Sequence, residues 1–326
     1  MDVEDGATGG PSSSSAASQS TEPQLPPHLV PLIRPLTLRT GAAAVPHPDK
    51  MKAGARGVAR QDSGHAGEDA YFVVSSGGAA TPGSVVLGVA DGVYAWRDKG
   101  IDAGAFSRAL CAAAAAQAVA AVPDQGGGAS PLRLMQGAYR AVLAAQVQGS
   151  CTACFVIVDP VEGIVRSANV GDSGYLLMTP RRGQVAPASL AVQATWQPGG
   201  VKYRSPHQEH EFGRPYQLGH HPNSDSPEDA MLHAARICGG DVLVVGSDGL
   251  WDNLHDSEVA AAVQAGIDAK HSPGAIARAV AAAAFERSTL KRGSTPYSLA
   301  ASEAHDLVFS GGKRDDIAVL VMLAEA

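Results

Sequence analysis

Short apolar segments that come in pairs are the feature that most constrains how this chain of 326 residues can fold. Six runs of five to nine residues are rich in Val, Ile and Leu, which is typical of buried β-strands. Some consecutive runs are separated only by a short turn, as in VDPVEGIV at 158–165, and strands joined in this way lie antiparallel. The predicted strands are 71–75, 84–90, 153–159, 164–170, 241–247 and 316–324.

Between these runs the chain has four segments of helical composition, and they also come in pairs. A strict alternation of strand and helix would favour a parallel sheet, whereas paired strands and paired helices favour antiparallel sheets covered by helical hairpins. The sequence therefore predicts an α+β fold built in layers. The predicted helices are 102–122, 131–147, 256–269 and 273–290.

The composition excludes several classes of protein. The chain has 25 Lys and Arg against 32 Asp and Glu, a formal net charge of −7, which argues against a basic nucleic-acid-binding scaffold. The longest apolar stretch, 109–122, is interrupted by Gln117 and is shorter than the roughly 20 residues that span a bilayer. The first 20 residues are acidic and rich in Ser and Gly, unlike a secretory signal. We therefore expect a soluble intracellular protein that has no transmembrane segment and binds no nucleic acid.

The distribution of residue types divides the chain into three regions. Residues 1–30 are rich in Ser, Gly, Pro and Ala and contain four acidic residues but no Lys or Arg, so we predict a disordered acidic tail. Residues 31–66 contain four prolines that prevent a long helix, and we predict an extended lead-in segment. Residues 67–326 are then expected to form the folded domain.

The four cysteines are too few for a disulfide scaffold, and we expect reduced thiols. Cys151 and Cys154 form a C-x-x-C pair at the start of an apolar run, but an odd spacing places two side chains on opposite faces of a strand. No second pair and no suitably spaced histidine completes a zinc site. We interpret these thiols as structural.

Three aspartates share an unusual context at the ends of predicted strands. Asp91 and Asp248 directly follow an apolar run and are each followed by glycine, and Asp315 comes just before the last run. If the last strand is antiparallel to its neighbours, the ends of two strands and the start of a third meet at one edge of the sheet. We therefore predict that these three carboxylates converge, although Asp-Gly after a strand is also ordinary turn chemistry.

Converging carboxylates indicate a metal site. They repel one another unless a cation neutralises them, and oxygen ligands select hard ions such as Mg²⁺ or Mn²⁺. Two such ions about 3.5–4 Å apart would hold a bridging hydroxide and polarise a phosphoryl oxygen, as hydrolysis of a phosphomonoester requires. Gly92 has no side chain, so its carbonyl group can reach an ion. From these residues alone, the metal site and the ordinary turn both stay open.

The order and content of eight motifs distinguish between these interpretations. From Gly67 to the C-terminus they resemble the successive motifs of the type 2C family of metal-dependent protein phosphatases. Within this family the chain is most similar to an organellar subgroup with a PYQL loop, which includes the mitochondrial type 2C phosphatases and the plastid photosystem II core phosphatase. The motifs are GEDAYF (67–72), GVADGV (88–93), WRDKGIDAGAFSRAL (96–110), GSCTACFVIVD (149–159), ANVGDSG (168–174), QEHEFGRPYQL (208–218), GDVLVVGSDGLWDNL (240–254) and GGKRDDIAVLV (311–321).

The resemblance implies a four-layer αββα sandwich, in which helical hairpins flank a central antiparallel β-sandwich with a two-metal site at one end. It implies a protein serine/threonine phosphatase in which a metal-bridging water attacks the phosphorus of phosphoserine or phosphothreonine directly, without a phospho-enzyme. Two Mg²⁺ or Mn²⁺ ions per site, a third, weaker ion, phosphorylated protein substrates and a monomeric state are expected. HPDK at 47–50 is most similar to the plastid branch, so we expect a chloroplast location, with the mitochondrion and the cytoplasm as alternatives.

The resemblance also assigns roles to residues. Asp91 matches the aspartate that bridges both ions, and Gly92 matches the glycine whose carbonyl binds one of them. Asp248 and Asp315 match the remaining direct ligands, so the three aspartates are the expected catalytic residues. Glu68 and Asp69 match an acidic pair that contacts metal-bound waters, and Asp172 and Asp252 match positions that hold the third ion in some members.

Two departures from the family pattern concern the substrate. Many members have an arginine a few residues before the acidic pair that grips the phosphate, but here the matching stretch is DSGHAGED at 62–69. His65 is the nearest candidate in that stretch, with Arg60 further back, and Arg97 is the basic residue near Asp91 that we would test for phosphate binding. The family's DGHGG is replaced by Asp-Gly-Val-Tyr-Ala at 91–95, so we expect a metal-bound water to act as the general acid.

Other functions are less consistent with the sequence. A catalytically inactive phosphatase-like binding module is the main alternative, but it would be expected to lack a metal ligand, and all three aspartates are present. GDSG at 171–174 also occurs in trypsin-like serine proteases, which need a histidine and an aspartate in earlier motifs that this chain lacks. No G-x-G-x-x-G motif indicates a dinucleotide-binding fold.

Overall fold

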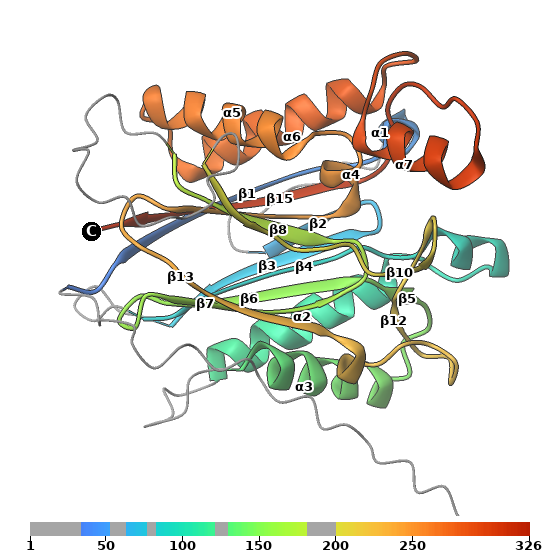
Figure 1. Cartoon of the computed structure of the whole chain (residues 1–326). Coiled ribbons are helices and arrows are strands. Elements are labelled where there is room, and N and C mark those ends of the chain that lie inside the picture. The colour runs from blue at the N-terminus through green and yellow to red at the C-terminus, as the bar shows by residue number, and fades with distance from the viewer. Residues whose placement is uncertain (1–33, 53–62, 77–82, 121–129, 181–199) are drawn as a thin grey trace, which may run out of the picture.

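The structure is a computed structural model that describes residues 34–52, 63–76, 83–120, 130–180 and 200–326. The predicted disordered tail, 1–30, lies outside the described residues. In the described part, two antiparallel β-sheets lie face to face, and helices cover the outer face of each sheet (Figure 1). This is the predicted four-layer αββα sandwich, and the α+β fold class is confirmed.

One sheet has five strands and the other has six, and neighbouring strands in both are antiparallel. The five-stranded sheet has the order β1 (Thr37–Val45), β15 (Ile317–Glu325), β14 (Val242–Gly246), β8 (Gly174–Met178) and β9 (Val201–Arg204). The six-stranded sheet has the order β13 (Met231–Arg236), β7 (Ile164–Val170), β6 (Ala153–Asp159), β4 (Val85–Ala90), β3 (Asp69–Ser75) and β2 (Ser63–Ala66).

The strand β14 shows why the central runs are apolar at every position. Val242 and Val244 pack in the hydrophobic cluster beneath the helices, whereas Leu243 and Val245 pack in the cluster between the two sheets. Alternate residues of a strand point to opposite faces, and both faces are covered here. The core therefore consists of three apolar layers, one between the sheets and one under each pair of helices.

Two helical pairs form the outer layers. α5 (Asp256–Asp268) and α6 (Pro273–Ser288) cover the five-stranded sheet, and α2 (Ala105–Ala120) and α3 (Pro131–Ala144) cover the six-stranded sheet (Figure 1). Ser130 and Ser272 begin α3 and α6, because each side chain accepts a hydrogen bond from a backbone N–H of the first turn, at 3.1 and 3.3 Å, and each is followed by proline. The six predicted strands and four predicted helices are all present.

Two further strands lie within residues 31–66, which the sequence predicts as an extended lead-in. β1 pairs with β15 over all nine of its residues, and β2 pairs with β3. The sequence of β1, TLRTGAAAV, has few large apolar residues, because small residues meet the helix above it. Ala43 is buried beneath α6, and Gly41 lies against the backbone of Gly274 at the start of that helix. This segment is therefore part of the sandwich.

Shorter elements gather mainly at one end of the sandwich, on the right in Figure 1. Two of them, α1 and α4, place residues of the site described below. The short helices are α1 (Pro48–Lys52), α4 (Asp248–Trp251) and α7 (Pro296–His305), with 3₁₀ turns η1 (Tyr94–Lys99) and η2 (Pro227–Asp229). Two small ladders pair β5 (Ser150–Cys151) with β12 (Leu218–Gly219), and β10 (Glu209–Glu211) with β11 (Arg214–Pro215).

The cysteines are free thiols, as expected. Cys151 packs against the layer of α2 and α3, and Cys154 packs between the sheets, so the two side chains do lie on opposite faces. Burial raises the pKa of the Cys154 thiol to about 12, which keeps it protonated and unreactive. Within the described ranges, no helix combines the length and the apolar character that crossing a membrane requires.

Candidate metal centre

The three aspartates at strand ends meet at the end of the sandwich where α1 and α4 lie. Asp248 follows β14 and Asp315 precedes β15, and these strands are antiparallel neighbours, so the end of one lies beside the start of the other. Asp91 follows β4, which belongs to the opposite sheet. The carboxylates therefore converge across the end of the sandwich, not along the edge of one sheet as the sequence suggested. Asp91 and Asp248 are close enough for the charge of Asp248 to raise the pKa of Asp91.

Asp91 and Gly92 are fixed by the backbone around them. The Asp91 carbonyl accepts a hydrogen bond from the Thr152 N–H at 2.9 Å, and the Gly92 N–H donates to the Glu68 carbonyl at 3.2 Å. A Cβ atom at Gly92 would lie 2.3 Å from the Ala103 carbonyl oxygen, which no side chain tolerates. The glycine that follows Asp91 is therefore required by packing, whatever its carbonyl binds.

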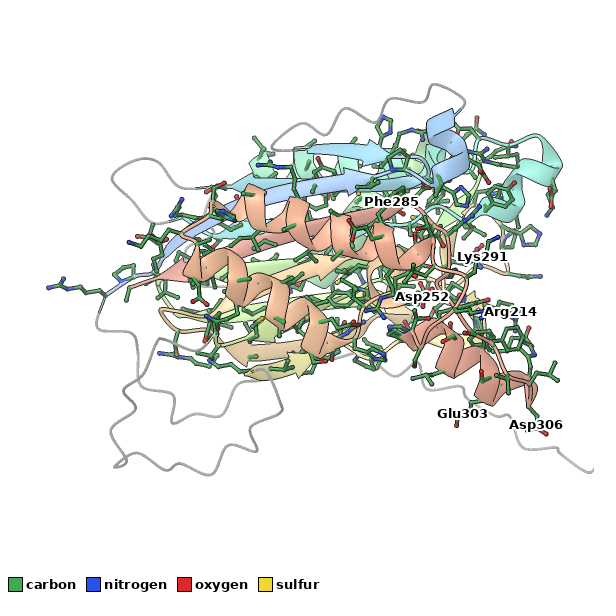
Figure 2. All side chains as sticks on the ribbon, turned by 90° about the horizontal axis from the view of Figure 1, so that it is seen from above. Arg214, Asp252, Phe285, Lys291, Glu303 and Asp306 are labelled. Atoms are coloured by element: carbon green, nitrogen blue, oxygen red, sulfur yellow. The ribbon has the colours of Figure 1, made fainter. Side chains whose placement is uncertain are left out.

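A short helix and a turn place the two positions expected to hold a third ion. Asp248 is the first residue of α4, and Asp252 follows its last residue, one turn further on, so both carboxylates lie on the same side of the helix. Figure 2 shows Asp252 between the end of α6 and α7. Asp172 is buried in the turn between β7 and β8, where its charge interacts with those of Asp248 and Asp252. The structure thus brings Asp172 and Asp252 to the three strand-end aspartates.

The acidic pair at the start of β3 has two different environments. Asp69 is fully buried, and its Oδ2 accepts a hydrogen bond from Ser247 Oγ at 2.6 Å. Glu68 is also buried, but it forms ion pairs with Lys50 and Arg97. Asp69 therefore lies among the other aspartates, whereas Glu68 forms ion pairs with two basic side chains at the rim of the cluster.

Several carboxylate oxygens in the cluster have no partner. Among the buried side-chain atoms of the described residues, Asp69 Oδ1, Asp172 Oδ1 and Asp248 Oδ1 make no hydrogen bond. Burying a carboxylate oxygen in this way is costly unless a proton or a cation satisfies it. The donors are all oxygens, which suit Mg²⁺ or Mn²⁺, so these side chains are chemically fit to hold divalent ions. In the described part of the chain, however, no three metal-binding side chains already stand in a geometry that would hold an ion.

The pKa values of the cluster reflect an excess of buried negative charge. Burial, followed by the charge of Asp248, raises the pKa of Asp315 to about 7 and holds that of Asp91 well above its usual value. Burial and the charge of Asp316 do the same to the pKa of Asp69. Asp248 is the exception. Its burial would raise its pKa, but the Lys313 ammonium and several hydrogen bonds keep that pKa below the usual value.

Lys313 supplies a positive charge within the cluster itself. Its Nζ lies 2.5 Å from Asp248 Oδ2, 2.7 Å from Asp252 Oδ2 and 3.2 Å from Asp315 Oδ2. Burial would lower the pKa of Lys313, but these carboxylates raise it well above the usual value, so the side chain is a fixed cation. Lys313 was not among the predicted site residues, although it stands two positions before Asp315 in the GGKRDD motif.

The two residues expected to contact phosphate have different surroundings. Arg97, on η1, reaches the cluster by its ion pair with Glu68. His65 lies on β2 with an exposed side chain, and the structure does not bring it into contact with the aspartates. A third cation, Lys50 of α1, was missed by the sequence analysis. It forms ion pairs with Glu68 and Asp316, and its only sequence signal was its place in the HPDK motif.

Asp316 organises this side of the site although it is not an expected ligand. Its buried carboxylate accepts hydrogen bonds from the backbone N–H groups of His47, at 2.7 Å, and Glu68, at 2.8 Å, and pairs with Lys50. A Cβ atom at Gly67 would collide with this carboxylate. Asp316 therefore ties the segment after β1 to the turn that carries Glu68 and Asp69.

A cavity of about 850 Å³ opens beside the cluster, between β9 and the α4–α5 connection. Arg204 lies over the Trp251 ring, 3.8 Å from its centre, and its Nη2 is 3.0 Å from His207 Nε2. Burial and the Arg204 charge lower the pKa of His207 to about 4, so the imidazole is neutral at physiological pH. His207 lines this cavity, and the charge of Asp248 also acts on its pKa.

Known proteins resemble the chain in sequence and in structure. The family model "Protein phosphatase 2C" matches residues 229–293. "Probable protein phosphatase 2C 55" of Arabidopsis thaliana is 34% identical over 294 residues, which cover 90% of this chain and 53% of that protein. "Protein phosphatase PTC7 homolog fig" of Drosophila grimshawi is 32% identical over 274 residues, 79% of this chain and 80% of that one.

Among solved structures, the X-ray structure of the photosystem II phosphatase PBCP matches with a TM-score of 0.68 and 28% identity, over 88% of this chain and 98% of that one. The chain spans about half the length of the first Arabidopsis relative but most of the Drosophila protein and of the solved structure. The similarity therefore extends over most of the fold, not only over the residues that the family model matches. On this evidence, the chain belongs to the protein phosphatase 2C family.

Proposed function

We propose that this chain is a metal-dependent protein serine/threonine phosphatase that hydrolyses phosphoserine and phosphothreonine. The observation that carries the proposal is the convergence of aspartates from both sheets on one end of the sandwich, with three buried carboxylate oxygens that lack a hydrogen-bond partner. Family membership supports the same activity. An inactive binding module would be expected to have lost a ligand, and the ligand positions Asp91, Asp248 and Asp315 are all present.

In this proposal the acidic residues divide into three groups. Asp91, the Gly92 carbonyl, Asp248 and Asp315 hold two Mg²⁺ or Mn²⁺ ions, and Asp69 and Glu68 orient waters around them. When bound, such ions supply Lewis-acid polarisation of the phosphoryl group and lower the pKa of water. Asp172 and Asp252 lie close enough to Asp248 for their charges to interact with it, and they are the proposed ligands of a third, weaker ion.

The cations at the rim of the cluster are proposed to bind the substrate phosphate. Arg97 and Lys50 both pair with Glu68, so this carboxylate holds two positive side chains in fixed positions beside the aspartates. A guanidinium group keeps further N–H donors for a phosphoryl oxygen after it has paired once. Arg97 and Lys50 are therefore better placed than His65 to bind the phosphate, and Arg60 lies outside the described residues.

The natural substrate is proposed to be a phosphorylated protein. Similarity to the photosystem II phosphatase PBCP supports a chloroplast location and a phosphoprotein of that compartment as the substrate. Imaging of a C-terminal fluorescent fusion, with comparison of phosphopeptides between cells that have and lack the protein, would test both points. A fusion confined to mitochondria or to the cytoplasm would contradict the location.

The activity is tested by hydrolysis of a phosphothreonine peptide with Mn²⁺ or Mg²⁺. We expect Asp248→Asn to reduce the rate by on the order of 100-fold or more, because a direct ligand and a buried charge are lost together. The matched control is Asp268→Asn, an exposed aspartate at the end of α5. Activity that survives EDTA, or that Asp248→Asn leaves intact, would contradict the proposal, and metal binding without hydrolysis would favour the inactive module.

A further inference from the structure

We propose that Lys313 is an internal counter-ion of the metal centre, whose ammonium group competes with divalent cations for the same carboxylates. This inference rests on the metal site of the proposed function, but it concerns the affinity of that site and not the reaction. The ammonium contacts one oxygen from each of Asp248, Asp252 and Asp315, at 2.5 to 3.2 Å. These three residues include two proposed ligands of the catalytic ions and one of the third ion.

Hydrogen bonds hold the backbone of Lys313 in this position. Asn253, which is fully buried, accepts a hydrogen bond from the Lys313 N–H at 3.0 Å and donates one to its carbonyl at 2.9 Å. The same Asn253 amide donates to the carbonyl of Gly249 on α4. These bonds tie the backbone of Lys313 to the helix that carries Asp248, so the start of its side chain is fixed relative to that helix. The lysine is thus held at a fixed place relative to two of its carboxylate partners.

The preceding residues fix the approach to Lys313. The carbonyl of Gly311 accepts a hydrogen bond from Thr295 Oγ1 at 2.9 Å, and the N–H of Gly312 donates to the Leu290 carbonyl at 3.0 Å. Gly311 has a φ of +99°, and a Cβ atom at Gly312 would lie 2.2 Å from the Arg287 carbonyl oxygen. These contacts fix the backbone of residues 311 and 312, and this backbone places the Lys313 ammonium beside the aspartates.

The Lys313 ammonium and a divalent ion compete for two reasons: both need the same carboxylate lone pairs, and their positive charges repel each other. An ion that binds the Oδ2 atoms of Asp248, Asp252 or Asp315 must take a lone pair that the ammonium now uses. An ion that binds only the free Oδ1 of Asp248 still meets a positive charge on the same carboxylate. Lys313 thus stabilises the metal-free protein and raises the ion concentration needed to load it.

The test is calorimetric titration of the full chain with Mn²⁺ and, separately, with Mg²⁺, after removal of metals with EDTA and dialysis. We expect Lys313→Met, which keeps most of the length of the side chain but not its charge, to bind Mn²⁺ on the order of 10-fold more tightly, the scale on which neighbours of a metal site change its affinity. Lys313→Arg keeps the charge and is expected to retain weak binding. Lys291→Met, an exposed lysine near the end of α6 (Figure 2), controls for the change in net charge.

Thermal unfolding gives a second readout that does not depend on activity. In EDTA, Lys313→Met is expected to melt below the wild type because three carboxylates lose their counter-ion. In saturating Mn²⁺ the difference should vanish or reverse, because the ions then supply the positive charge. A Lys313→Met chain that is unfolded in EDTA and folds when Mn²⁺ is added would show the same exchange.

Two results would overturn the inference. One is unchanged or weaker Mn²⁺ binding by Lys313→Met, which would make Lys313 a support of the bound ions. The other is a melting temperature of Lys313→Met that equals the wild type in EDTA, or a chain that stays unfolded in both EDTA and Mn²⁺. Failure of the wild type to bind Mn²⁺ at all would instead contradict the proposed function, so the two failures are distinguishable.

Discussion

The carboxylate of Asp316 offers a test of how the first and last parts of the chain are joined at the site. Asp316→Asn keeps the size of the side chain but removes its charge and one of its two acceptor oxygens. Only one of the two backbone N–H groups, those of His47 and Glu68, can then keep its acceptor, and the other faces an amide NH₂ group. The Lys50 ammonium also loses one of its two carboxylate partners.

The expected loss of stability can be worked out from these contacts. A buried N–H without an acceptor costs about 1–3 kcal/mol, and breaking a buried ion pair from one side costs about 3–5 kcal/mol in total. Asp316 is 2% exposed and the Lys50 side chain is 15% exposed, so solvent screens the pair little. Since Lys50 keeps its ion pair with Glu68, we expect Asp316→Asn to lower the free energy of unfolding by about 3–4 kcal/mol.

Urea denaturation in EDTA measures this loss, with the midpoint shifted and the slope unchanged. Asp268→Asn, at an exposed site, is the matched control and should change the stability by less than about 0.5 kcal/mol. A double-mutant cycle with Lys50→Met should show a coupling of about 1–3 kcal/mol between the two side chains. A loss below about 1 kcal/mol for Asp316→Asn, or zero coupling, would refute the view that Asp316 ties the two segments together.

Three further predictions follow from other parts of the structure. Asn253→Ala removes three buried hydrogen bonds and should cost about 2–4 kcal/mol in urea denaturation, and a cost below about 1 kcal/mol would show that the Lys313 loop is held by other contacts. In EDTA, the wild type should lose stability relative to Asp315→Asn as the pH rises from about 5 to about 7.5, because the folded-state pKa of about 7 lies above the unfolded value of 3.8 and the folded chain binds the extra proton. A parallel pH dependence of the two proteins would contradict this. A chain that begins at Gly67 lacks β1 and leaves one edge of β15 unpaired, so it should show no cooperative unfolding by circular dichroism, whereas native-like unfolding would make β1 dispensable.

The main layers of the fold could be predicted because a strand that is buried on both faces has a continuous apolar sequence. β14 and β15 are apolar at almost every position, and Ala-rich segments form the covering helices. β1 escaped prediction because it packs small residues against α6 and mixes Thr, Arg and Gly with Ala. Its strand character is decided by its pairing with β15, a partner that no local pattern reveals.

The part of the candidate site that could be predicted is the set of aspartates that stand at the ends of strands. The aspartates after β4 and β14 and before β15 were found because a turn residue with a carboxylate is visible next to an apolar run. Lys50 and Lys313 were not, because their positions beside the carboxylates depend on the path of the chain in three dimensions. His65 is near the acidic pair in sequence but points outward from β2, whereas Lys50 is much further away in sequence and contacts Glu68.

The position of β15 has a consequence for how the protein is made. This strand lies between β1 and β14, and the hydrogen bond between His47 and Asp316 joins residues 269 positions apart. A ribosome adds about 5–20 residues per second, so on the order of tens of seconds pass between the synthesis of the first aspartates of the site and that of the last. During that time β14 presents an unpaired apolar edge, which a chaperone has to cover or which invites aggregation. A premature stop before Asp315 would remove at once a proposed metal ligand and the strand that joins β1 to β14.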